Sequence, residues 1–147
     1  MYKVLLVDDE RIIVDGISRM VDWAAIGTEL AGTAANGLEA FDFIRERGPD
    51  IVISDIRMPG MDGLELVERA HRVCPRVRFV LLSGFGEFDY ARSAMQYGVK
   101  HYLLKPTNEG KIAGALASVV DELRQSEQRD AFVAGMKERL DKMLPHA

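Results

Sequence analysis

Five short apolar segments, each followed by a segment of helical character, are the feature of this chain that most restricts its fold. They cover residues 3–7, 29–34, 51–53, 77–82 and 101–104. The run at 51–53 shows no polar alternation, which is typical of a strand buried on both faces. Strands that alternate with helices form a parallel sheet covered by helices on both faces. We therefore predict an α/β fold with a doubly wound, five-stranded parallel sheet; its flavodoxin-like strand order is an expectation that alternation alone does not fix.

The segments between these strands carry apolar residues at helical spacing. We predict helices over residues 11–20, 38–47, 63–73 and 88–97, and a last helix from residue 108. The second of these is expected to turn Leu38, Phe41 and Ile44 toward the core. Gly98 is placed to end the fourth helix, and Asn108 is placed to begin the fifth as its N-cap.

The last helix is longer than the covering of a sheet requires, because about 12–15 residues at ~1.5 Å rise each suffice. Helical character continues to residue 144, and Pro145 is expected to end it. The second half has an apolar stripe of its own, made of Phe132, Val133, Met136, Leu140 and Met143. We expect residues 124–147 to form a helical linker that pairs with another chain as a coiled coil or leads into a domain outside this chain; a frayed amphipathic tail is the alternative.

The composition gives no sign of a nucleic-acid-binding surface, a membrane segment or a thiolate metal cluster. The net charge of the 147 residues is −4, and Cys74 is the only cysteine. No stretch approaches the ~20 apolar residues that a membrane span needs. We therefore expect a cytoplasmic protein without disulfides or membrane contact. His71 and His101 are expected to be solvated, and His146 lies in the tail; none of the three has a plausible metal-binding partner.

Residues able to carry chemistry stand at the ends of the predicted strands. Asp8 and Asp9 follow the first strand, Asp55 the third, Ser83 the fourth and Lys105 the fifth. Ligands of open parallel sheets bind beyond the carboxyl ends of the strands, so these side chains are expected to meet. Clustered carboxylates repel each other unless a cation joins them, and Mg²⁺ prefers oxygen ligands. The sequence therefore predicts a Mg²⁺ site at this edge of the sheet.

A carboxylate beside Mg²⁺ can attack phosphorus and form an acyl phosphate, and Asp55 is the candidate nucleophile. Transfer spreads negative charge over three phosphoryl oxygens. Mg²⁺ would bind one of them and the Lys105 ammonium a second, while the Ser83 hydroxyl and the Gly84 N–H would stabilise the third.

Each of these motifs also has a simpler explanation. The acidic pair can cap a helix, Ser83-Gly84 can serve only as a turn, and Lys105-Pro106 can be an exposed loop. The peptide bond before Pro106 can be cis, which would aim the lysine inward. The joint order and spacing of the motifs favours the phosphoryl-transfer interpretation over these separate ones.

The motifs together resemble those of response-regulator receiver domains of bacterial two-component signalling, over residues 1–123. The resemblance rests on Val-Asp-Asp-Glu at 7–10, Asp-Ile-Arg-Met-Pro-Gly-Met-Asp-Gly at 55–63, Leu-Ser-Gly at 82–84 and Tyr-Leu-Leu-Lys-Pro at 102–106. It implies Asp55 as the phosphoacceptor and Asp9 as a direct Mg²⁺ ligand. It also implies Asp8 as a ligand largely through water, and the backbone carbonyl of Arg57 as a further ligand.

The resemblance implies a switch as well as an acceptor site. Ser83 would be the switch hydroxyl, Tyr102 the switch aromatic, Lys105 the phosphoryl-binding lysine, and Gly63 a structural position. The implied partner is a sensor histidine kinase, and the implied result of phosphorylation is a homodimer. Such a domain is a phosphoacceptor that catalyses its own modification and slow dephosphorylation, and it is not expected to be a turnover enzyme.

Two further motifs resemble the subgroup that carries an AraC-type DNA-binding domain. They are Asp-Trp at 22–23 and Ser-Gly-Phe-Gly-Glu-Phe-Asp-Tyr at 83–90. DNA binding is expected only through a C-terminal domain outside this chain. Lys100-His101 departs from the family, whose members often have an acidic residue there. Arg57 and Phe85 flank the phosphoryl site and are expected to tune dephosphorylation.

Two other classes of function remain open at this stage. An aspartyl-nucleophile phosphatase would use a similar residue set, but it needs a second Asp at the position that Arg57 occupies. A phosphorylation-independent interaction module could share the fold, although it would not need the complete set of acid, hydroxyl and lysine. Turnover of a phosphate ester would identify the first class, and failure to accept a phosphoryl group would identify the second.

Overall fold

The sheet contains five parallel strands in the order β2-β1-β3-β4-β5, in a computed structural model that describes residues 1–144. This is the predicted doubly wound, flavodoxin-like arrangement. The strands are β1 (Tyr2–Val7), β2 (Thr28–Ala34), β3 (Ile51–Asp55), β4 (Arg78–Ser83) and β5 (His101–Leu104).

Five α-helices alternate with the strands, as the sequence predicts. They are α1 (Arg11–Met20), α2 (Gly37–Arg47), α3 (Gly63–Val73), α4 (Phe88–Ala94) and α5 (Glu109–Met143), with short 3₁₀ segments η1 (Ala24–Ile26) and η2 (Met95–Tyr97). The predicted helix over 88–97 therefore ends in a 3₁₀ turn. Gly98 closes it with a φ of 84°, and the Asn108 side chain caps α5 by accepting from the Lys111 N–H, both as predicted.

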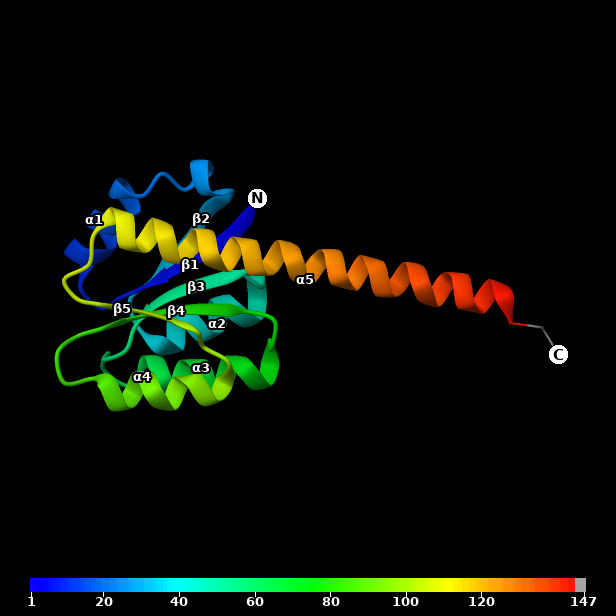
Figure 1. Cartoon of the computed structure of the whole chain (residues 1–147). Helices are drawn as coiled ribbons and strands as arrows, with labels where there is room; N and C mark the ends of the chain where they lie inside the picture. Colours follow the sequence, from blue (N-terminus) through cyan, green and yellow to red (C-terminus); the bar gives the residue numbers. More distant parts are fainter. Residues whose placement is uncertain (145–147) are drawn as a thin grey trace.

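The sheet separates two apolar cores because successive side chains of each strand point to opposite faces. In β1, Val4 and Leu6 face the core beneath α1 and α5, whereas Leu5 and Val7 face the core beneath α2, α3 and α4. Figure 1 shows these helix layers on the two sides of the sheet. Burial on both faces explains why the strands are continuous apolar runs rather than alternating ones.

The predicted inward face of α2 was wrong at one position. Leu38 is 60% exposed, and the helix packs through Ala40 and Ile44 instead. The Asn36 side chain accepts from the Glu39 N–H and fixes where the helix begins. Ala40 and Ile44 are four residues apart and share a face, while Leu38 lies about 200° around the axis from Ala40.

The backbone is closely packed where β3 turns into α3. The Gly63 N–H donates to the Ile56 carbonyl at 2.6 Å. A Cβ on Gly63 would collide with the Asp55 carbonyl oxygen and would lie 2.8 Å from the Ile56 Cα. Gly63 is therefore required for α3 to begin directly against the end of β3. After β5, two strands away in the sheet, the Lys105–Pro106 peptide bond is cis.

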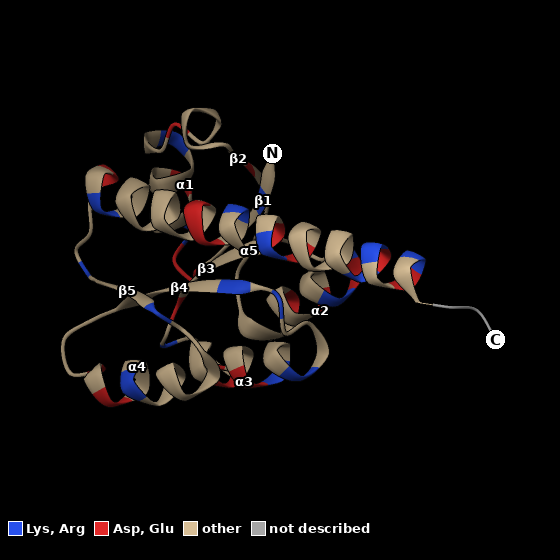
Figure 2. Cartoon of the chain, turned by 45° about the vertical axis from the view of Figure 1, so that its right-hand side comes forward, with Lys and Arg blue, Asp and Glu red and all other residues tan. Residues whose placement is uncertain are grey.

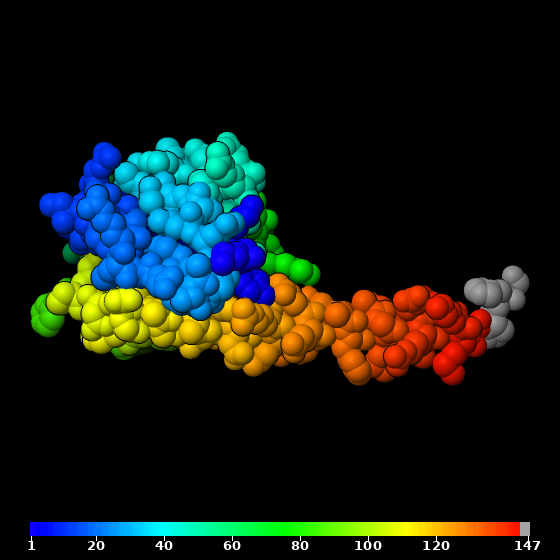
Figure 3. Space-filling model, turned by 90° about the horizontal axis from the view of Figure 1, so that it is seen from above, coloured from blue at the N-terminus to red at the C-terminus, as the bar shows by residue number. Residues whose placement is uncertain are grey.

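Helix α5 divides into a covered half and a projecting half. Ile112, Leu116 and Val119 of the first half are fully buried against the sheet. At the edge of the globular part, the Tyr2 hydroxyl donates to Glu127 at 2.9 Å. Beyond it the helix extends alone, as Figures 1 and 3 show.

The apolar stripe of the projecting half has no covering in the structure. Phe132, Val133, Met136, Leu140 and Met143 are between 46% and 80% exposed. Acidic and basic residues lie side by side along this helix (Figure 2), so its charge is mixed rather than basic. The predicted stop at Pro145 and the tail residue His146 lie outside the described residues. Within residues 1–144, no helix is both long enough and apolar enough to cross a membrane.

Candidate functional site

The carboxyl edge of the sheet brings together side chains from four strands. Asp55 ends β3 and Ser83 ends β4, while Asp8 and Lys105 directly follow β1 and β5. Asp8 and Ser83 are each 1% exposed and Asp55 is 5% exposed, so the site is recessed. The parallel pairing of the strands is what aligns their ends, as the sequence predicts.

Lys105 joins the two buried carboxylates. Its Nζ lies 3.0 Å from Asp55 Oδ2 and 3.3 Å from Asp8 Oδ2. Its backbone N–H donates to the Ser83 carbonyl at 2.7 Å, which fixes the lysine beside the end of β4. Burial lowers the pKa of Lys105, but the hydrogen bonds and charges of Asp55 and Asp8 together outweigh burial and raise this pKa above its usual value. The lysine is therefore held as a cation at the centre of the site.

Asp55 is a carboxylate in an unfavourable environment for its charge. Burial raises the pKa of Asp55 from 3.8 to about 6, against the hydrogen bond from Lys105. The negative charges of Asp8 and Glu87 act in the same direction as burial. One lysine thus does not compensate the acidic groups around it, and an additional cation would favour the ionised form of Asp55.

The chemistry of the donor set fits Mg²⁺. Carboxylate oxygens of Asp8, Asp9 and Glu10 lie within 4.8 Å of one another. Asp9 and Glu10 are exposed, so a partly hydrated ion could reach them. The predicted participation of Asp55 and of the Arg57 carbonyl stays a prediction. Glu10 belongs to the acidic group although only Asp8 and Asp9 were predicted as ligands.

The Gly84 amide, a predicted donor to the phosphoryl group, already has a partner. It donates to Glu87 Oε2 at 2.6 Å, and Glu87 is 8% exposed. Sequence reasoning missed Glu87 as a site residue. The available signal was an acidic residue three positions beyond the predicted donor, where a side chain can fold back onto the turn.

Two aromatic residues, Tyr102 of β5 and Tyr90 of α4, lie on the elements that follow Ser83 in the chain. Tyr102 is half-buried, pairs with Leu81 in the sheet register and packs on the core beneath α2, α3 and α4. The guanidinium of Arg57 lies 5.8 Å from the centre of the Tyr90 ring. Arg57 and Tyr90 therefore link the loop after Asp55 to α4. Phe85, the other predicted flanking residue, is fully exposed.

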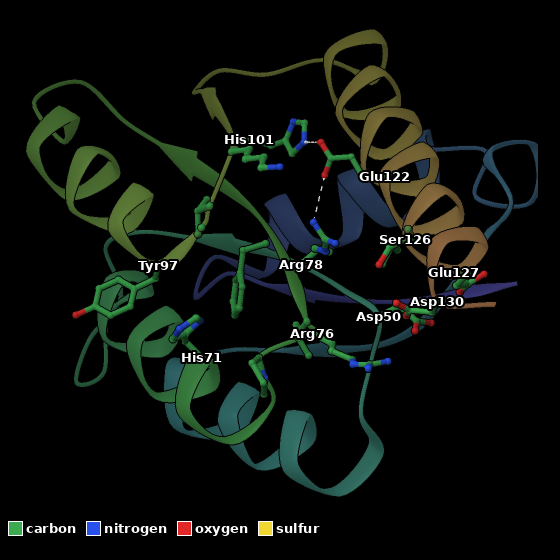
Figure 4. A pocket seen from close by; sticks show the side chains of 17 residues that line it. Asp50, His71, Arg76, Arg78, Tyr97, His101, Glu122, Ser126, Glu127 and Asp130 are labelled. Carbon is green, nitrogen blue, oxygen red and sulfur yellow. Dashed lines mark hydrogen bonds and ion pairs between the residues drawn. The ribbon is translucent and has the colours of Figure 1, made fainter. Parts of the chain in front are cut away.

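A separate groove of about 550 Å³ lies where β4 and β5 begin, at the opposite edge of the sheet (Figure 4). The Nε2 atom of His101 lies within hydrogen-bond distance, 3.0 Å, of Glu122 Oε1, and the guanidinium of Arg78 lies 3.6 Å from Glu122 Oε2. His101, expected to be solvated, is half-buried, with its side chain 21% exposed. His71 is exposed at the other end of the groove, as predicted.

Comparison with known proteins agrees with the geometry. The sequence model of the family "Response regulator receiver domain" matches residues 4–117. An uncharacterized transcriptional regulatory protein, YesN of Bacillus subtilis, is 51% identical over 141 residues, which cover 96% of this chain and 38% of YesN. The transcriptional regulatory protein HptR of Staphylococcus aureus is 34% identical over 131 residues, which cover 88% of this chain and 51% of HptR. This chain thus spans about half or less of these relatives.

Solved structures support the same relationship. The REC domain of AraT, a response regulator from Geobacillus stearothermophilus, has a TM-score of 0.81 and 36% identity, with 86% of this chain and 98% of that chain covered. A two component transcriptional regulator AraC from Clostridium phytofermentans has a TM-score of 0.81 and 28% identity, with 86% and 98% covered.

Proposed function

This chain belongs to the response regulator receiver domain family, and from that premise we propose that it is a phosphorylation-dependent switch of a two-component system. Asp55 would accept a phosphoryl group from a sensor histidine kinase. The observation that carries the proposal is the position of Lys105, whose Nζ lies within 3.3 Å of both Asp55 and Asp8 at the carboxyl edge of the sheet.

The chemistry is an in-line transfer to a carboxylate. An ionised oxygen of Asp55 attacks phosphorus, and the P–N bond of the kinase's phosphohistidine breaks with its electron pair on the imidazole nitrogen, which takes up a proton. The product is an acyl phosphate on Asp55. The Lys105 ammonium stabilises one phosphoryl oxygen, and the Ser83 hydroxyl with the Gly84 N–H stabilises another.

Mg²⁺ is the proposed cofactor of this transfer. Held by Asp8, Asp9, Asp55 and the Arg57 carbonyl, it would neutralise charge on the third phosphoryl oxygen. The raised pKa of Asp55 supports this assignment, because crowded carboxylates gain most from a cation. The chain acts as a phosphoacceptor that hydrolyses its acyl phosphate slowly, rather than as a turnover enzyme.

The proposed signal passes from the phosphoryl group to the surface of α4 and β5. The new dianion attracts the Ser83 hydroxyl, and Tyr102 turns into the space that this movement vacates. The changed surface then biases two chains toward a homodimer. The half-buried position of Tyr102, on the strand beside Ser83, supports this role.

The proposed output is control of transcription by a DNA-binding domain that would follow residues 124–147 in the whole protein. YesN and HptR are named transcriptional regulators, and this chain matches 38% and 51% of their lengths. The projecting half of α5 would be the connection between the receiver domain, residues 1–123, and that domain. Its exposed apolar stripe suits a coiled coil with a second copy.

The test is intact mass after incubation with Mg²⁺ and acetyl phosphate, with the wild type and the Asp55→Asn variant in parallel. We expect the wild type to gain one phosphoryl mass and the variant to gain none. Size-exclusion chromatography of the same samples should show a shift toward dimer only where the mass is gained. Equal modification of the variant would refute Asp55 as the acceptor. Failure both to bind Mg²⁺ and to gain mass would favour a phosphorylation-independent module, whereas Mg²⁺ binding without a gain of mass would indicate a strict need for the cognate kinase.

A further inference from the structure

Glu87 is a buried acidic residue to which neither the motifs nor the proposed transfer assigns a role. It is 8% exposed and directly precedes the first turn of α4. Its Oε2 accepts a hydrogen bond of 2.6 Å from the Gly84 N–H. The proposed function assigns this same amide as a donor to a phosphoryl oxygen. The Glu87 carboxylate and that oxygen would therefore compete for one N–H group.

The surroundings of Glu87 do not neutralise its charge. Among residues 1–144 no Lys, Arg or His nitrogen lies within 4.0 Å of its carboxylate, and within this range the Gly84 amide alone donates a hydrogen bond to it. Burying a carboxylate with a single neutral donor is costly. The charge also reaches the acceptor, since Glu87 contributes to the raised pKa of Asp55. Glu87 is thus placed as a further anion, beside Asp55 and Asp8, in a site that must receive a phosphoryl group.

We infer that Glu87 is a positioning residue that occupies the phosphoryl-binding amide of Gly84 in the unphosphorylated state and must leave it when Asp55 is modified. The inference rests on the proposed function and adds to it a competing group built into the chain. The carboxylate oxygen stands where an anionic phosphoryl oxygen would bind. Transfer to Asp55 would therefore replace one anion with another on the same donor.

The departure of Glu87 would act directly on α4. The Glu87 carbonyl accepts from the Ala91 N–H at 3.2 Å, and the Glu87 N–H donates to the Gly84 carbonyl at 3.3 Å. The residue is therefore part of both the loop and the first helical turn. Gly86 lies between them with a φ of 84°, a conformation that side chains disfavour, and nothing contacts the position of its missing Cβ. The backbone of the 84–87 loop can therefore change conformation at Gly86 without a steric clash.

The experiment compares wild type, Glu87→Ala, Glu87→Gln and Asp89→Ala. The probe is Mg²⁺ with beryllofluoride, an analogue that places a tetrahedral phosphoryl mimic on a carboxylate. Two readouts are the amide resonance of Gly84 in ¹⁵N spectra without the probe and the dissociation constant of the probe. Asp89 is an exposed acidic residue in the same turn, so its variant makes the same change in charge without the hydrogen bond.

In Glu87→Ala we expect the Gly84 amide proton to move upfield and its hydrogen exchange to accelerate, because it loses a charged acceptor. The dissociation constant of the probe should fall about tenfold, since a charge-assisted hydrogen bond no longer competes. Glu87→Gln keeps an acceptor but loses the charge, and it should give a smaller change in the same direction. Asp89→Ala should match the wild type. If Glu87→Ala does not fold, Glu87→Gln carries the same test.

The inference is overturned if neither Glu87 variant tightens binding, or if Asp89→Ala tightens it equally, which would indicate a general effect of charge. An unchanged Gly84 amide in the Glu87 variants would also overturn it. Each of these results leaves the proposed function intact as long as the wild type binds the probe. Absence of binding in all four proteins would instead refute the proposed function, and the inference with it.

Discussion

The two edges of the sheet show what distinguishes a reactive group of charges from a structural one. At the edge where β4 and β5 begin, Glu122 is balanced by Arg78 and His101. At the carboxyl edge, Lys105 is outnumbered by buried acidic groups, and the pKa of Asp55 is raised to about 6. The first group is satisfied within the chain, whereas the second is completed only by a cation or a phosphoryl group. Unbalanced buried charge is the feature that marks the functional edge.

The largest expected effect is on phosphoryl transfer, through the Lys105 ammonium that lies between Asp55 and Asp8. Lys105→Gln should slow the gain of phosphoryl mass from acetyl phosphate about a hundredfold, because it removes a charge aimed at a phosphoryl oxygen. Lys100→Gln removes an exposed lysine from the groove at the other edge and should leave the rate within about twofold. Equal phosphorylation rates in the two variants would contradict the claim that only the carboxyl edge of the sheet takes part in phosphoryl transfer.

The close packing of the carboxyl edge predicts a large effect on stability. Gly63→Ala should lower the free energy of unfolding by about 2 kcal/mol, because the new methyl group would collide with the backbone of Asp55 and Ile56. Gly135→Ala is the matched change on the projecting part of α5, where nothing lies within 4 Å. It should raise stability by up to about 1 kcal/mol, because alanine favours helix. Urea denaturation measures both; a Gly63 variant as stable as wild type would contradict the packing.

The raised pKa of Asp55 predicts that this residue destabilises the metal-free protein at neutral pH. Its folded-state pKa of about 6 exceeds the usual 3.8, so the folded protein holds the proton more tightly than the unfolded chain. The contribution of Asp55 to the free energy of unfolding is therefore fully present below pH about 4, and it is lost as the pH rises through about 6. Asp55→Asn, which carries no charge, should therefore be more stable than wild type near pH 7.5 by about 1 kcal/mol after allowance for solvent screening.

Thermal unfolding in a chelator at two pH values checks this prediction. The advantage of Asp55→Asn should disappear near pH 4, where residue 55 is neutral in both proteins. Lys105 keeps Asp8 as a partner in the variant. An advantage that persists at low pH would point to packing rather than charge.

The smallest expected effect belongs to the balanced edge. Glu122→Gln weakens the contacts to Arg78 and His101, and it should cost less than about 1 kcal/mol because these side chains are partly exposed. The loss should shrink at high salt, and the phosphorylation rate should not change. A loss above about 2 kcal/mol, or a slower phosphorylation, would show that the two edges are coupled.

The fold was predictable because its signals are local. The strand that contains the apolar run at 51–53 ends at Asp55, and burial on both faces leaves such a run no role except a central strand. The capping side chain of Asn108 likewise acts within one turn of helix. Leu38 was misplaced because two successive steps of three residues, from 38 to 41 to 44, each fall about 60° short of a full turn, so Leu38 and Ile44 lie about 120° apart around the helix axis. Packing against the sheet selects the face that carries Ala40 and Ile44.

The site was predictable in its strand-end residues and not in its loops. Parallel pairing alone brings Asp8, Asp55 and Lys105 to one edge, so their order in the chain was sufficient. The contact of Glu87 with the Gly84 amide depends on the loop folding back over three residues. The sequence does not reveal the backbone conformation of this loop. An acidic residue in a polar loop is expected to be exposed, so the burial of Glu87 could not be predicted.

The continuity of α5 gives the molecule a mechanical property. The helix is fixed near its middle by the contacts of Glu122 with His101 and of Glu127 with Tyr2, and it continues without a break to Met143. The sixteen residues beyond Glu127 form an arm of roughly 24 Å at 1.5 Å per residue. A tilt of about 10° at the fixed point would displace the tip by roughly 4 Å. A small rotation of α5 against the core would thus displace the end of the helix by about the distance between consecutive Cα atoms.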